Sequence, residues 1–132
     1  MEIRIEKPFF LHLDCVEIDE NVPSMRMQAV IEVQLFGHIL KYHCSLWFDC
    51  SVWGAFVASL DSIDMAEASL VDMGGHFVLR LSAISGKPEI LWEVKKAAVS
   101  GAVATAAFRS QIDEDTLAHV RRQFTQFESW WD

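Results

Sequence analysis

The chain has 132 residues, of which 52% are apolar and 23% charged, and 19 acidic against 11 basic side chains give a formal net charge of −8. This length and composition predict a single folded domain over residues 1–132 and argue against disorder. An acidic chain whose Lys/Arg clusters are no longer than a pair repels phosphate backbones and anionic lipid headgroups, so we expect binding to neither nucleic acid nor membrane surfaces.

The longest uncharged run, 97–108, falls short of the roughly 20 apolar residues that a membrane helix needs. The N-terminus lacks the cationic and apolar segments of a secretory signal, so a cytoplasmic protein is expected. Cys15, Cys44 and Cys50 are an odd number of cysteines without a CxxC spacing, which favours buried, reduced thiols over a disulfide framework or a zinc site.

Alternation of apolar and polar residues with period two predicts four strands in the first half of the chain. In the second of them the apolar phase slips between Leu13 and Val16, and a bulge near Asp14 and Cys15 would absorb the slip. The predicted strands are 2–6, 10–19, 25–35 and 39–48, with a tight reversal at 36–38.

A short helix is predicted next, capped by Asp49 or Ser51, because Trp53, Phe56 and Leu60 have the spacing of one helical face. Weaker and stronger strand patterns follow it, with a glycine pair as one of the turns. These strands are predicted at 67–73, 76–84, 89–95 and 102–112.

The last twenty residues, 113–132, have the pattern of one amphipathic helix capped by Asp113. Its apolar stripe consists of Leu117, Val120, Phe124, Phe127 and Trp131. The strand before it is rich in alanine, and small side chains let a large helix approach closely, so we expect this helix to dock on its own sheet.

These elements together predict an α+β fold. Its core is an antiparallel β-meander of about seven or eight strands, with one short internal helix and one long C-terminal helix packed on the sheet. The pattern leaves open whether the sheet is single and curved, sandwich-like or barrel-like.

No catalytic, cofactor-binding or metal-binding residues are predicted, so the chain is not expected to be an enzyme. The five histidines lack HxH and HxxxH spacings, and His43 and Cys44 are neighbours on a strand, so their side chains point to opposite faces. No strained nucleophile turn is present, and the paired carboxylates lie at turns and helix starts, where capping is their usual role.

The five tryptophans are dense for a chain of this size, and indole rarely buries completely. Trp47, Trp92 and Trp130 are therefore candidates for a protein interface, where exposed aromatic residues are the preferred anchors. The alternative is that they fill the seam between sheet and helix or a second core.

One segment gives a family resemblance. The run Leu46-Trp47-Phe48-Asp49-Cys50 leads from a strand into the short helix, Ala-Ser-Leu and Phe-Val-Leu-Arg-Leu strands follow, and Phe108 to Leu117 leads into the final helix. This order resembles the small bacterial immunity proteins of the WapI type. The chain departs from that pattern at Lys95-Lys96-Ala97-Ala98-Val99, where a more polar, glycine-rich strand is expected, and no binding residues carry over.

The resemblance implies a bacterial, non-enzymatic protein that binds and blocks a toxin domain, and the acidic charge suits a basic partner. A toxin-neutralising immunity or protein-binding module is thus the first hypothesis. The alternatives are a self-associating structural domain, possible as a homodimer, and a small-ligand-binding protein with no bound cofactor.

Overall fold

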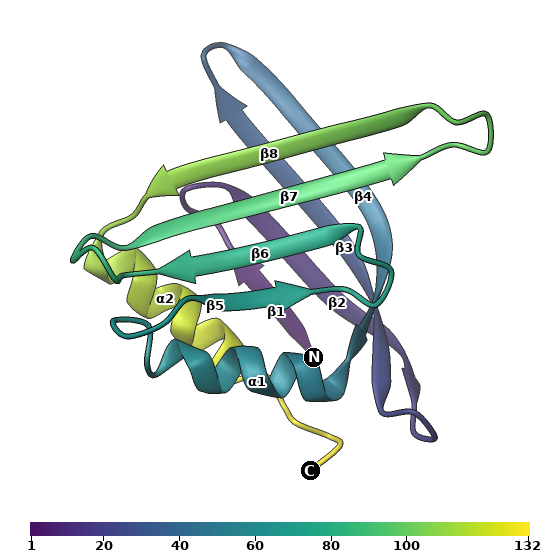
Figure 1. Ribbon diagram of the computed structural model, residues 1–132, viewed down its shortest axis with the longest axis horizontal. Helices are drawn as coiled ribbons and strands as arrows, with labels where there is room; N and C mark the ends of the chain where they lie inside the picture. The colour runs from purple at the N-terminus through teal and green to yellow at the C-terminus, as the bar shows by residue number, and fades with distance from the viewer.

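The order of elements repeats along the chain, because four strands and then a helix occur twice (Figure 1). The computed structural model describes residues 1–132. The first half consists of β1 (Glu2–Ile5), β2 (Phe10–Asp19), β3 (Ser24–Leu35), β4 (His38–Asp49) and α1 (Cys50–Leu60). The second half consists of β5 (Ala68–Val71), β6 (Phe77–Ser82), β7 (Glu89–Ala97), β8 (Val103–Gln111) and α2 (Glu114–Thr125).

Each half forms its own antiparallel sheet, with the strands side by side in chain order. Sheet A is β1-β2-β3-β4 and sheet B is β5-β6-β7-β8. The predicted α+β fold with an antiparallel meander is confirmed, and the number of sheets is settled as two. Their strands cross in Figure 1, and the apolar faces of both sheets enclose one core, as in a sandwich.

The alternation of β3 explains why one face of sheet A is buried. Met25, Met27, Ala29 and Ile31 are at most 2% exposed, whereas Gln28, between them, faces solvent. The apolar phase of β2 changes where the prediction placed it, because its register with β3 shifts between residues 15 and 17.

The two helices cover one outer strand of each sheet. α1 begins where the Asp49 carboxylate accepts the N–H of Ser51 at 2.8 Å, so Asp49 is the cap. α1 then packs beside β5, and α2 packs beside β1, where the Arg4 N–H donates to Oε1 of Gln123 at 2.9 Å. Neither helix has the length and apolar character that crossing a bilayer requires.

The prediction that the final helix runs to Asp132 is wrong, because α2 ends at Thr125. The Thr125 hydroxyl donates to the carbonyl of Arg121 at 2.9 Å, a bond that competes with the regular helical pattern. Beyond that point the chain is no longer helical, and Phe127 packs against Trp53 with ring centroids 4.9 Å apart.

The prediction that the final helix packs on the protein's own sheet is confirmed, because α2 contacts β1 of sheet A and α1. The expected position is wrong, because α2 packs at sheet A and not over the alanine-rich strand that precedes it. The alanine-rich strand before it, β8, is the outer strand of sheet B, and Ala102 and Ala104 are exposed. The small side chains of β8 therefore have no helix above them.

Candidate functional site

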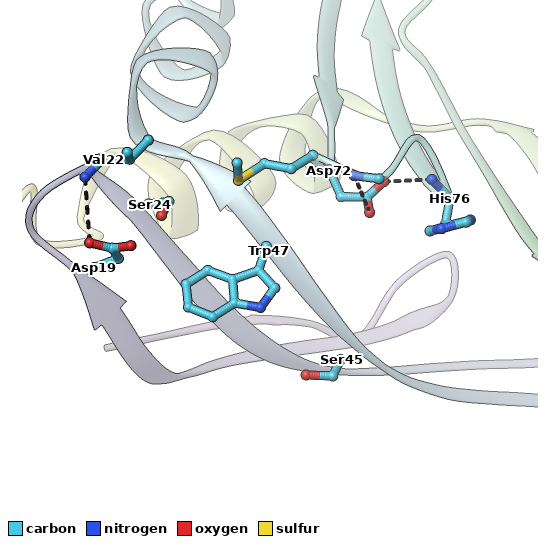
Figure 2. A pocket seen from close by; sticks show the side chains of 9 residues that line it. Asp19, Val22, Ser24, Ser45, Trp47, Asp72 and His76 are labelled. Carbon is cyan, nitrogen blue, oxygen red and sulfur yellow. Dashed lines mark hydrogen bonds between the residues drawn. The ribbon is translucent and has the colours of Figure 1, made fainter.

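A hollow of about 590 Å³ opens beside Trp47, where three segments meet (Figure 2). The segments are the turn between β2 and β3, the second half of β4, and the turn between β5 and β6. We call it the Trp47 hollow. Its lining residues are Asp19, Val22, Ser24, Ser45, Trp47, Asp72, Met73, Gly74 and His76.

Trp47 is held in place by its neighbours on β4 and by a turn of sheet B. It lies opposite Arg26 of β3, and its neighbours Leu46 and Phe48 are buried, so the indole points away from the core. Its carbonyl accepts the N–H of Met73 at 2.7 Å, which joins the edge of sheet A to a turn of sheet B. The Trp47 side chain is half-buried, as an interface anchor would be.

Two more apolar side chains flank the indole. Val22 is 56% exposed and Met73 is 54% exposed, and each comes from a different turn. Figure 2 shows Trp47 lying between the turn of Asp19 and Val22 and the turn of Asp72 and His76. The hollow thus offers an apolar wall built from three segments that are distant in sequence.

Asp72 shapes the far side of the hollow. It is 7% exposed, and its Oδ1 accepts the N–H groups of His76 at 2.7 Å and Phe77 at 2.8 Å. Its Oδ2 accepts the N–H of Gly74 at 3.2 Å. A buried carboxylate that accepts several backbone N–H groups fixes the turn and lies beside the hollow.

The electrostatics of the hollow are negative. Asp19 contributes the second carboxylate, and its Oδ1 accepts the N–H of Asn21 at 2.9 Å. No Lys or Arg is among the lining residues. Arg26 donates to the Ser45 hydroxyl at 3.2 Å, but its charge is paired with Glu17, 2.8 Å away.

This arrangement can accept a cationic side chain from a partner. The aliphatic stem of an Arg or Lys packs well on an indole, and its charged group would then lie near the carboxylates at a partly desolvated surface. Val22 and Met73 extend the apolar contact on either side.

The prediction that Trp92 belongs to a protein interface is wrong, because its side chain is 1% exposed and cannot reach a partner. Its parity on β7 is that of the buried Ile90 and Val94, so the indole points into the core. Phe108 stacks on it at 6.1 Å between ring centroids, and Phe9 meets it edge-on at 5.9 Å.

Trp130 is half-buried and lies in the irregular segment after α2. Its ring meets that of Trp131 at right angles, with 5.6 Å between centroids. Trp130 is not among the residues of the Trp47 hollow, so the structure does not bring these two predicted interface residues into one site.

The cysteines are three free thiols. Burial raises the pKa of Cys15 and Cys44, and raises the pKa of Cys50 to about 11, so all three are protonated at neutral pH. His43 and Cys44 lie on opposite faces of β4, and no three His, Cys, Asp or Glu side chains converge in a geometry that holds a metal ion.

Sequence reasoning missed Val22, Asp72 and Met73, which lie in turns. The signal for Asp72 was present, because an aspartate before a glycine pair is typical of a turn whose carboxylate binds backbone N–H groups. Nothing in the local sequence indicated that this turn would meet Trp47, since the contact joins two sheets that are separate in the chain.

The comparisons with known proteins gave no relative for this chain, since no family model, curated protein or solved structure matched it.

Proposed function

We propose that the protein is a non-enzymatic protein-binding module, and that it recognises a basic segment of its partner through the Trp47 hollow. The observation that carries this proposal is the half-buried indole of Trp47 at the centre of a hollow that contains two carboxylates and no cationic side chain.

The apolar part of the hollow supports a protein partner. Interface anchors are enriched in tryptophan and are most effective when less critical contacts surround them and exclude water. Val22 and Met73 are placed to supply such contacts, and both are more than half exposed in the isolated chain.

The charge of the protein supports a basic partner. A net charge of −8 attracts a cationic protein over long range and speeds its association. At short range, the negative charges of Asp19 and Asp72 beside the indole favour Arg or Lys over an acidic side chain.

The narrower form of the proposal is toxin neutralisation in the bacterial cytoplasm. It rests on the resemblance to immunity proteins of the WapI type and on the acidic charge, which suits a basic toxin domain. In this form the hollow receives a cationic side chain of the toxin, and the complex blocks the toxin's active domain.

Affinity capture tests the binding function. The wild-type chain and the Trp47→Ala variant serve as baits in an extract of the organism that encodes the chain, and captured proteins are identified by mass spectrometry. We expect a basic protein on the wild-type bait, with Trp47→Ala weakening the purified complex by about 2 kcal/mol or more, as loss of an interface hot spot does. Met65→Ala, which changes an 83% exposed residue outside the hollow, is the matched control and keeps full affinity.

Equal affinity of wild type and a folded Trp47→Ala variant would exclude the hollow as the binding site. The narrower form is tested by co-expression with a basic toxin encoded beside this gene. Growth should be rescued by the wild-type chain and not by Trp47→Ala. A specific partner that is no toxin would retain the binding function and reject neutralisation.

A further inference from the structure

The outer strand β8 has an unpaired edge. It pairs with β7 on one side only. The N–H of Ala98 donates to the carbonyl of Ala102 at 2.7 Å, and that of Ile112 donates to Pro88 at 3.0 Å. Because bonded pairs alternate along an antiparallel ladder, the odd-numbered residues of β8, such as Thr105 and Ala107, direct N–H and C=O away from β7.

This edge lacks the features that usually protect an outer strand. Natural edges carry charges, prolines or bulges, or they are covered by a helix. The stretch from Val103 to Phe108 contains no charge and no proline, and its register with β7 is regular. By contrast, β1 lies beside α2, and β5 lies beside α1.

Next to this edge, the hairpin of β3 and β4 projects beyond β8 (Figure 1). Leu35 and Leu40 are on its inner face but are 45% and 39% exposed, because sheet B does not reach that far. At the tip, Phe36 is 92% exposed. A groove of about 360 Å³ separates this hairpin from Ala107 and Phe108.

The hairpin of β7 and β8 projects in the same way beyond β4 (Figure 1). A hollow of about 300 Å³ lies on it, and its lining is made of small side chains, among them Ala97, Ala102 and Ala104, together with Lys96. One projecting hairpin therefore presents large apolar side chains, and the other presents a shallow surface of alanines.

We infer that β8 pairs antiparallel with β8 of a second copy of this chain, so that two sheets B become one continuous sheet across a two-fold axis. If the two-fold axis passes through a residue of β8, each odd-numbered residue of one copy lies opposite an odd-numbered residue of the other. Their outward N–H and C=O groups then meet, and the faces of the two sheets stay in phase.

The same two-fold rotation explains the two projecting hairpins. In one chain the β3–β4 hairpin passes beyond β8 and the β7–β8 hairpin passes beyond β4 (Figure 1). The rotation therefore brings the β7–β8 hairpin of one copy near the β3–β4 hairpin of the other. Phe36 and Leu40 of each copy then cover the alanine-lined hollow of its partner, and large side chains fill a surface of small ones. Such a contact is isologous and closes as a dimer.

The centre of the β8 edge carries no charge that would oppose a second copy. From Val103 to Phe108 the chain has no acidic and no basic side chain, so two copies that meet there bring no like charges into direct contact.

Sedimentation over a wide range of protein concentration, from micromolar upward, tests the dimer. We expect a dimer that dissociates on dilution. Thr105→Pro removes an outward N–H without breaking the β7 ladder and should weaken the dimer at least about tenfold, whereas Thr105→Ala keeps that N–H and should have little effect. A wild-type chain that stays monomeric would overturn the proposal, as would a dimer that Thr105→Pro leaves unchanged.

Hydrogen exchange gives a second readout that needs no substitution. The amides of Thr105 and Ala107 should exchange slowly in concentrated protein and quickly in dilute protein, while the amide of Ala106, which faces β7, stays protected in both. Equal exchange at both concentrations would refute pairing through β8. Trp47→Ala should dimerise like the wild type, so failure of this proposal and failure of the partner-binding function are separate results.

Discussion

The covered and uncovered sides of the sandwich differ in how their apolar side chains are used. On the covered side, helices close the outer strands, and Leu60, Leu117 and Val120 are at most 4% exposed. On the uncovered side, beside β4 and β8, Phe36 is 92% exposed and Ile39 is 66% exposed. The first side contributes to the stability of the isolated chain, and the second is available for association.

The largest expected effect lies on the covered side. Phe124 packs on Trp53 and Phe56, with ring centroids 5.5 and 4.9 Å away, and is 1% exposed. Phe124→Ala should lower the free energy of unfolding by about 3–5 kcal/mol, because it empties a buried aromatic site. Chemical denaturation measures this value, and a melting temperature within a degree or two of the parent would contradict the packing role.

Asp72 lies where the two sheets are joined, and its removal should have the next largest effect. Asp72→Ala leaves the N–H groups of Gly74, His76 and Phe77 without their acceptor, at a cost of about 2–3 kcal/mol. Asp72→Asn keeps one acceptor oxygen and is the matched control, with a smaller loss expected. Equal denaturation midpoints for the two variants would show that the backbone bonds are not the source of the stability.

Substitution of Phe36 is expected to raise the free energy of unfolding, whereas the two substitutions above lower it. Phe36 has a positive φ of 56° at the tip of the β3–β4 hairpin, a conformation that costs a bulky residue roughly 1–2 kcal/mol and that asparagine adopts readily. Phe36→Asn should therefore raise the free energy of unfolding of the monomer by about 1 kcal/mol while weakening the dimer.

Denaturation and sedimentation of the same Phe36→Asn sample separate these two effects. A variant that is less stable as a monomer would mean that the exposed Phe36 ring contributes to folding. The uncovered side would then also contribute to the stability of the isolated chain.

The smallest effect concerns the helix caps on the covered side. Hydrogen bonds from Ser51 lower the pKa of Asp49, and hydrogen bonds from Thr116 lower the pKa of Asp113. A lowered pKa in the folded state means that the stabilisation is present above the ordinary carboxyl pKa, near 4, and is lost as the pH falls through the lowered value. Melting temperature measured from about pH 6 to pH 2 should fall less steeply for Asp113→Asn, which accepts the same N–H without titrating.

Local features of the fold could be predicted from the sequence. Three features that depend on patterns within a few residues are confirmed. They are the alternating burial from Met25 to Ile31, the bulge of β2 and the Asp49 cap. The errors concern long-range placement. Alanines on β8 are compatible with a covering helix and with a free edge, and only the contact of α2 with β1 decides between them.

The candidate site was predictable only in part. The outward parity of Trp47 was visible, and the structure keeps it half-buried. The prediction of an exposed Trp92 failed. It rested on the number of tryptophans in the chain, and that number does not indicate that Phe9 and Phe108 enclose the Trp92 ring. The partners of Trp47 come from turns of both sheets, and no pattern within one strand predicts them.

The separation of the two sheets in the chain has a consequence for folding. Every strand pairs only with its neighbours in sequence, so sheet A can form as soon as residues 1–49 have left the ribosome. Its apolar face then stays open to water until residues 68–111 supply sheet B. An open apolar face favours aggregation during that interval, so a pause in translation after α1 should lower the yield of native protein.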